Sequence, residues 1–278
     1  MTIGTLENVG INQILDTFNL SFSDYILPFK LSEEQFKNKI ISDSIDLSLS
    51  VGAFEEDKLI GVILHGKDVI DGKNTAYNAG TGVIPESRGQ GITRKLYDFI
   101  IPELKRKNFS QIQLEVLTEN TAAKHTYEKL GFQVSRELGC YKGNLNKKGT
   151  DSTNIHPLKE YDWNQLQQFW DCKPSWQNSI TAVENLFQTN VSIGIYDQKD
   201  LMGYLIFNPI TKRIHQFAVN KENRRKGLGK QLLDYIISED TMPVTIINVD
   251  NSAIATAKFL QSNGLGMFIR QYEMTLAI

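Results

Sequence analysis

The sequence predicts an α/β protein built from two tandem copies of one domain. The first observation is length, since 278 residues exceed what a single core usually organises. The second is an internal repeat, because residues 83–93 align with residues 219–229 without a gap. The third is the polar stretch 144–154, which is typical of a linker. We therefore expect domains over residues 1–145 and 155–278, joined by a linker over residues 146–154.

The first half begins with two helices and continues with three strands. Apolar spacing predicts the helices over residues 12–22 and 32–41, and the second starts with the capping-box signal Ser32-x-x-Gln35. We expect the strands over residues 47–54, 59–64 and 75–83, with Gly80 and Gly82 marking a bulge or a close approach. After the repeated segment come a helix, a strand over 112–117 and a second helix.

The second half repeats this order. We expect helices over residues 163–170 and 180–187, strands over 191–196, 201–207 and 214–219, and then the repeated segment. A helix, a strand over 244–249 and a final helix follow. Trp163, Trp170 and Trp176 are expected in the core of this half, with a substrate-facing aromatic as the alternative.

Composition excludes several classes of function. The formal net charge of −2 and the pI near 6.1 argue against a nucleic-acid or membrane partner. Cys140 and Cys172 stand far apart and the four histidines are scattered, so neither a disulfide framework nor a metal site is predicted. Residues 1–16 carry no export signal and no run of 18 apolar residues occurs. We expect a cytoplasmic protein.

The repeated segment predicts an anion site. A strand ending at Val83 passes through Arg88-Gly-Gln-Gly91 into a helix, whose first N–H groups have no partner within the helix. Glycine permits positive φ values and close approach, and the helix dipole adds about half a positive charge there. A diphosphate is the expected occupant of the turn.

Two patterns in the chain resemble those of a known enzyme family. Arg88-x-x-Gly91-x-Thr93 and Arg224-x-x-Gly227-x-Gly229 resemble the Q/R-x-x-G-x-G/A coenzyme-A loop of the GNAT acyltransferases. Residues 120–132, from Asn120-Thr-Ala-Ala to Tyr-Glu-Lys-Leu-Gly-Phe132, are similar to that family's C-terminal motif. The resemblance implies two GNAT-like domains, each a mixed, mostly antiparallel sheet flanked by helices and splayed beside the strand that ends at Val83.

The resemblance also implies residues that bind acetyl-coenzyme A as co-substrate, without a metal. In the first domain they are Val83, Ile84, Arg88, Gly89, Gln90, Gly91, Ile92, Thr93 and Asn120. In the second they are Val219, Arg224, Arg225, Lys226, Gly227, Leu228, Gly229 and Lys230.

The implied reaction is an N-acetyltransferase reaction, in which a primary amine of a small molecule or peptide attacks the thioester directly. Tyr127 falls where the family places the hydroxyl that protonates or hydrogen-bonds the departing thiolate. With pKa values near 10 for a phenol and about 8.5 for a thiol, complete proton transfer is uphill by roughly 2 kcal/mol. The general base stays open among Glu115, Tyr77, Asn78 and a water chain.

The two copies differ where chemistry is expected. Leu260 stands at the position of Tyr127, so the second copy lacks the candidate acid. Its turn has the regular Gly229 where the first copy has Thr93, and it is richer in Lys and Arg. We therefore expect catalysis in the first domain and a structural, coenzyme-binding or substrate-shaping role in the second. The alternative is a non-catalytic acyl-coenzyme-A sensor or interaction module; the pattern does not indicate an oligomeric state.

Overall fold

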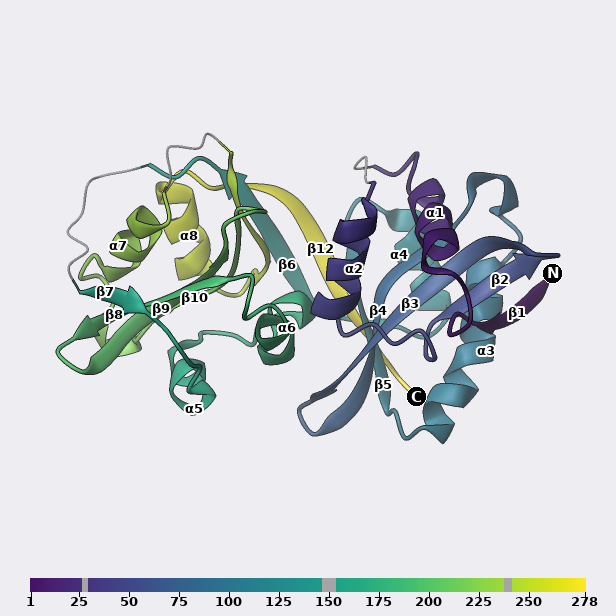
Figure 1. The fold of residues 1–278 in the computed structure, drawn as a ribbon, viewed down its shortest axis with the longest axis horizontal. Helices are drawn as coiled ribbons and strands as arrows, with labels where there is room; N and C mark the ends of the chain where they lie inside the picture. Colours follow the sequence, from purple (N-terminus) through teal and green to yellow (C-terminus); the bar gives the residue numbers. More distant parts are fainter. Residues whose placement is uncertain (27–29, 147–153, 238–241) are drawn as a thin grey trace. The chain divides into compact units, whose positions relative to one another are not determined.

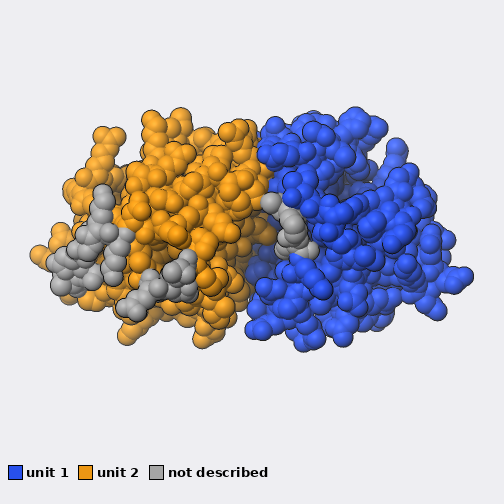
Figure 2. Space-filling model, turned by 90° about the horizontal axis from the view of Figure 1, so that it is seen from above, with its two compact units in different colours: residues 1–135, 272–278 blue, residues 136–271 orange. Residues whose placement is uncertain are grey.

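The computed structural model describes residues 1–26, 30–146, 154–237 and 242–278. The chain forms two compact units, coloured separately in Figure 2. The first unit holds residues 1–135 and 272–278, and the second holds residues 136–271. These units depart from the expected division, because residues 136–145 group with the second unit and residues 272–278 with the first. Most of the expected linker, residues 147–153, lies outside the described residues.

A mixed sheet forms the centre of the first unit. Its strands are β1 (Thr2–Thr5), β2 (Val51–Glu55), β3 (Lys58–Ile70), β4 (Lys73–Val83), β5 (Gln111–Leu117) and the end of β12 (Gly266–Ala277), hydrogen-bonded in that order. Neighbours from β1 to β4 are antiparallel, whereas β4 and β5 are parallel. The predicted mixed, mostly antiparallel sheet is confirmed for this unit.

Helices cover both faces of this sheet (Figure 1). The helices α1 (Ile11–Ser21) and α2 (Glu33–Ser42) pack on one face through Phe18 and Phe36. On the other face lie α3 (Ile92–Arg106) and α4 (Thr121–Lys129). The capping box at the start of α2 is present as predicted.

The strand expected over residues 47–54 begins only at Val51. The backbone N–H and the hydroxyl of Ser48 both donate to the Asp46 carboxylate, and the Ser50 hydroxyl donates to the Asp46 carbonyl. Local side-chain bonds of this kind favour a turn over a strand.

The second unit repeats the plan. Its strands are β7 (Ile155–Pro157), β8 (Val191–Asp197), β9 (Asp200–Asn208), β10 (Arg213–Val219), β11 (Val244–Asp250) and β6 (Gln133–Gly143), in that order. The helices are α5 (Trp163–Leu166), α6 (Ile180–Asn185), α7 (Leu228–Tyr235) and α8 (Ile254–Ser262). The helices α7 and α8 pack on one face and α5 on the other. The helix expected over 163–170 is shorter, because a 3₁₀ turn follows α5 and the backbone is extended at Trp170.

In both units the pair of parallel strands separates after a short ladder. The β4–β5 ladder ends at Asn78 and Leu114, although β4 continues to Val83. The β10–β11 ladder ends at Ile214 and Ile246, although β10 continues to Val219. The splayed sheet that the resemblance implied is therefore present twice.

A β-bulge lies at the start of each opening. In β4 the bulged residue is Ala79, since Leu64 pairs with Gly80 and His65 with Asn78. In β10 the bulged residue is His215, at the equivalent position of the repeat. The bulge predicted near Gly80 is thus confirmed. The close approach is confirmed as well, because a Cβ at Gly80 would lie 2.7 Å from the Phe18 ring.

The C-terminal residues 272–278 contribute a core residue to the first unit, and this can be tested. Met274 is fully buried in the cluster that includes α3. Met274→Ala is expected to lower the free energy of unfolding of this unit by about 2–5 kcal/mol, because the site cannot fully collapse. Urea denaturation followed by circular dichroism measures this change. The exposed Met242→Ala is the control, with an expected change within about 0.5 kcal/mol.

Candidate functional site

The repeated turns present backbone N–H groups at the ends of β4 and β10. In the first turn Gly89 and Gly91 have φ values of 77° and 69°. In the second, Arg225 and Gly227 have φ values of 62° and 84°. The first backbone hydrogen bonds of α3 and α7 run from the Lys95 N–H to the Gly91 carbonyl and from the Gln231 N–H to the Gly227 carbonyl. The N–H groups of residues 89–94 and 225–230 donate to no described backbone carbonyl. Alternating backbone conformations of this kind form a concave site for an anion.

Arg88 holds the first turn in shape. Its Nε donates to the Val83 carbonyl at 3.1 Å and one terminal nitrogen donates to the Ser21 carbonyl at 3.0 Å. The guanidinium also pairs with the Asp24 carboxylate at 2.6 Å. This pairing holds the pKa of Asp24 below its usual value. The side chain of Arg88 is thus bound to protein groups.

Arg224 makes the same contacts in the second turn. It donates to the Val219 carbonyl at 3.0 Å, to the Phe169 carbonyl at 2.9 Å and to the Asp171 carboxylate at 2.8 Å. Both arginine side chains are therefore bound to protein groups and fix the turn. The backbone N–H groups of the turn remain as donors for an anion.

The other coenzyme-binding residues predicted for the first unit differ in burial and in their contacts. Ile84 and Ile92 bury their side chains in the core, so they offer only backbone atoms. Gln90 is exposed and Thr93 half-buried at the start of α3. Asn120 caps α4 by accepting from the N–H of Ala123 at 3.1 Å.

Most of the residues predicted for the second unit surround one cleft of about 480 Å³. The cleft extends from the turn between the separated strands β10 and β11 to the N-terminal half of α8. The predicted residues that line it are Val219, Arg224, Arg225, Gly227, Leu228, Gly229 and Lys230. Lys226 instead donates to Asn223 at 2.8 Å, and the Lys230 ammonium pairs with Asp234.

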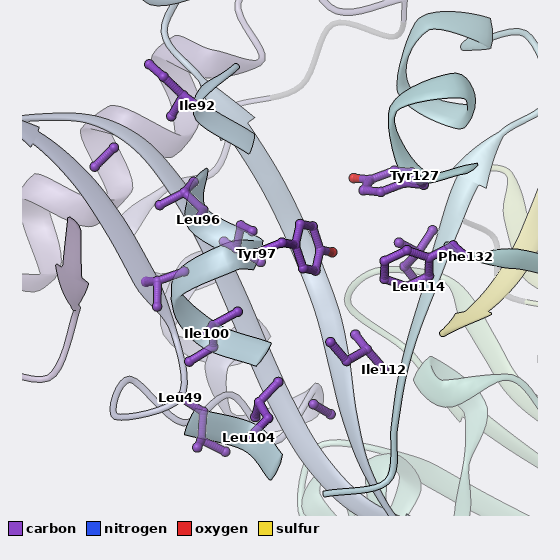
Figure 3. Packing of buried hydrophobic residues seen from close by; sticks show 14 of the residues in the cluster. Leu49, Ile92, Leu96, Tyr97, Ile100, Leu104, Ile112, Leu114, Tyr127 and Phe132 are labelled. Carbon is purple, nitrogen blue, oxygen red and sulfur yellow. The ribbon is translucent and has the colours of Figure 1, made fainter. Parts of the chain in front are cut away.

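Tyr127 reaches the opening between β4 and β5 from α4. Its ring packs edge-on against Tyr97 and Phe132. The hydroxyls of Tyr97 and Tyr127 point into the space between these two side chains (Figure 3). The side chain is buried, and burial raises the pKa of Tyr127 although Thr81 and Asn78 oppose the shift. The phenol therefore stays protonated at neutral pH and can donate a hydrogen bond.

The tertiary structure decides which candidate bases face which side of the sheet. Ile112, Leu114 and Val116 of β5 pack toward α3, so Glu115 points to the opposite face, on which α1 and α2 lie. There the hydroxyl of Tyr77 donates to the Glu115 carboxylate. Asn78 belongs to the other side, where its amide donates to Tyr97 Oη at 2.7 Å.

Sequence analysis missed the polar side chains that line the second cleft. Trp170 Nε1 donates to Tyr204 Oη at 2.5 Å, and that hydroxyl donates to Gln216 Oε1 at 2.8 Å. Trp170 was expected in the core, with a substrate-facing aromatic as the alternative. Leu260, at the position of Tyr127, is fully buried in the core of this unit. Strand alternation gives no signal for these partners, because Trp170, Tyr204 and Gln216 come from three separate segments.

Comparison with known proteins identifies the class to which this fold and these turns belong. The sequence model of the acetyltransferase (GNAT) family matches residues 12–132 and 156–264. The chain belongs to the GNAT acetyltransferase family and carries two copies of its domain. N-alpha-acetyltransferase 30 of Schizosaccharomyces pombe is 36% identical over 101 residues, which are 36% of this chain and 65% of the relative. The chain thus spans less than two thirds of that relative's length.

Solved structures share the architecture over the whole chain. A GCN5-related N-acetyltransferase from Sphaerobacter thermophilus has a TM-score of 0.72 at 13% identity and covers 99% of this chain and 95% of its own. A tandem GNAT protein from the clavulanic acid biosynthesis pathway has a TM-score of 0.69 at 14% identity, covering 99% and 98%. At these identities the likeness concerns the fold.

Two further observations concern the described part of the chain. No helix there is long and apolar enough to cross a bilayer. The same residues contain no group of three or more His, Cys, Asp or Glu side chains placed to hold a metal ion.

The protonation state of Tyr127 gives a pH-dependent expectation. Because the neutral phenol is favoured in the fold, its stabilising effect is complete below the ordinary pKa of 10.0 and is lost as pH rises through the higher folded pKa. In an alkaline titration followed by tyrosinate absorbance, Tyr127→Phe is expected to leave the early step intact and to reduce the late step. A reduced early step would contradict a buried, protonated Tyr127.

Proposed function

We propose that the first unit transfers an acetyl group from acetyl-coenzyme A to a primary amine of a small molecule or peptide. The observation that carries this proposal is the joint position of three features at one opening. They are the turn at Gly89–Gly91, the buried hydroxyl of Tyr127 and the Tyr77–Glu115 pair on the opposite face. Together these groups supply anion binding, a proton donor and a proton acceptor.

The diphosphate of the co-substrate would rest on the N–H groups of the turn, with the pantetheine arm along the free end of β4. Among the described residues, no strand pairs with the β5 side of β4 beyond Asn78, so the backbone groups of β4 there can pair with the amides of the arm. The bulge at Ala79 directs backbone groups into the same opening.

The acceptor enters from the face on which α1 and α2 lie. The uncharged amine attacks the thioester carbon, the carbon–sulfur bond breaks, and the sulfur leaves with the electron pair. Tyr127 stabilises that thiolate by donating a hydrogen bond, since full proton transfer is uphill by roughly 2 kcal/mol before any shift. The raised pKa of Tyr127 makes full transfer still less favourable. Glu115, held by Tyr77, takes the proton of the amine.

Two observations support an amine acceptor. The matching relative is named as an N-alpha-acetyltransferase. On the acceptor face, Glu115 provides a carboxylate within the opening, which favours a cationic amine by electrostatic attraction.

A non-catalytic role of the second unit is the second candidate function. Leu260 replaces the tyrosine, and the cleft of about 480 Å³ beside the second turn gives room for a pantetheine arm. On this view the second unit binds acyl-coenzyme A without transferring the acyl group.

The role of Tyr127 is tested by removing its hydroxyl. Tyr127→Phe is expected to lower kcat by about 10- to 100-fold at saturating acetyl-coenzyme A, because the thiolate loses its hydrogen-bond donor. Thiol release measured with a panel of primary amines reports the change. Tyr235→Phe, at an exposed phenol, serves as the control. Undiminished turnover would remove Tyr127 from the mechanism.

Occupancy of the second turn is tested separately at Gly227. Its φ of 84° costs a β-branched residue about 1–2 kcal/mol or more, so Gly227→Val is expected to distort the turn. Calorimetric titration with acetyl-coenzyme A should then show one binding site fewer than the wild type. Gly266→Val is the control in the same unit, since an added Cβ there meets nothing closer than 3.9 Å. An unchanged stoichiometry would exclude the second turn as a coenzyme site.

A further inference from the structure

Two buried polar groups in the cleft of the second unit have no hydrogen-bond partner among the described residues. They are His215 Nδ1 and Asn248 Nδ2. Their side chains are 5% and 4% exposed, and both residues line the cleft. A buried polar atom without a partner destabilises the fold, so two of them in one cleft indicate a ligand that satisfies both.

Their positions in the sheet bring the two groups to the same opening. His215 is the bulged residue of β10 and follows Ile214, the last residue paired with β11. Asn248 lies in a bulge of β11, two residues after Ile246, and has a φ of 58°. Both side chains thus stand where β10 and β11 separate, at the place that corresponds to the reaction centre of the first unit.

The chemistry of the pair follows from the contacts that their other atoms make. The carbonyl of Gln177 bonds the His215 ring, and since Nδ1 has no partner it is Nε2 that donates to it. Nδ1 is therefore an acceptor. Asn248 Oδ1 accepts from Gln271 Nε2 at 2.8 Å, so Asn248 Nδ2 is a donor. One acceptor beside one donor suits an N–H next to a carbonyl oxygen.

The charge of the cleft differs from that of the first unit. Its two described lining carboxylates are both ion-paired, Asp171 with Arg224 and Asp250 with Arg136. Burial, assisted by Arg213, holds the pKa of His215 well below its usual value. The described lining residues thus offer an alkylammonium ion no carboxylate outside an ion pair, and the neutral imidazole is a weak base for deprotonating such an ion.

The walls of the cleft favour a flat, apolar acceptor. Trp170 packs with the cluster on the α5 face, and Phe217 and Phe259 pack with the cluster on the α7 and α8 face, where their stacked rings have centroids 5.5 Å apart. Aromatic faces of this kind bind a further ring well.

We infer that the second unit is a second acyl-transfer centre, which acetylates weakly basic aromatic amines with His215 as proton acceptor. The inference rests on the proposed binding of acetyl-coenzyme A at the second turn, and it replaces the non-catalytic role that was the second candidate function. The amine nitrogen bonds to the thioester carbon, and Asn248 Nδ2 donates to the carbonyl oxygen. His215 Nδ1 takes the proton from nitrogen. The carbon–sulfur bond breaks with its electron pair on sulfur, and the thiolate leaves without a tyrosine because its own pKa is only about 8.5.

The test uses the full chain, acetyl-coenzyme A and two isomeric amines, p-toluidine and benzylamine. These probes share size and a ring but differ in basicity, since only benzylamine is charged at neutral pH. The quantity measured is the ratio of p-toluidine to benzylamine acetylation, from thiol release and product chromatography. His215→Phe is expected to lower this ratio at least about tenfold, and Tyr127→Phe to raise it by a similar factor. His156→Phe, at an exposed histidine of the same unit, should keep the ratio within about twofold of wild type.

Each outcome separates the inference from the proposed function. Benzylamine acetylation without p-toluidine acetylation overturns the inference and leaves the first centre in place. The reverse result supports the second centre and removes the first. An equal loss of both activities in either variant shows a single centre and overturns the inference. Acetylation of p-toluidine that survives His215→Phe also overturns it. His215→Gln is the second variant, should His215→Phe lower the thermal unfolding midpoint, and the same fall in ratio is expected of it.

Discussion

Each unit depends on two parallel strands that hydrogen-bond for a few residues and then separate. Where β4 leaves β5 after Asn78, and β10 leaves β11 after Ile214, backbone and side-chain groups are withdrawn from the ladder. A sheet interior normally satisfies such groups internally, so their release is possible only where another partner can replace the missing strand. The opening, the bulge beside it and the turn at its end therefore act as one feature.

In each turn the arginine side chain bonds to protein groups and so holds the backbone of the turn in place. Arg88 and Arg224 contact equivalent carbonyls and carboxylates, although the surrounding sequences differ. Anchoring the loop from behind keeps the alternating backbone conformations in place without a ligand, which lowers the conformational cost of binding one. The positive φ at Arg225, where the first copy has glycine, shows how strongly the second turn is constrained. The two turns thus have the same backbone shape although their side chains differ.

The repeat, the helix signals and the family resemblance were enough to predict two splayed α/β sheets and to locate both turns. These features are local, because a glycine at positive φ, a capping box or an apolar helical face each depends on neighbouring residues. It was not predictable that residues 136–143 join the second unit and residues 272–278 the first, since the sequence of a strand does not specify which sheet it enters. Glu115 was a candidate base in the sequence, but the side of the sheet that it faces depends on where α3 and α1 pack.

By itself the sequence determined the two-copy plan and the positions of both turns, and it led to the proposal that Tyr127 is the donor of the first copy, because each rests on a contiguous motif. The tertiary structure alone decided that His215 and Asn248 meet at the second opening. Their relation arises from bulges in two strands and from partners at Gln177 and Gln271, which are distant along the chain. Hydrogen-bond satisfaction is a property of the packed molecule, and no spacing in the sequence records which buried atom lacks a partner.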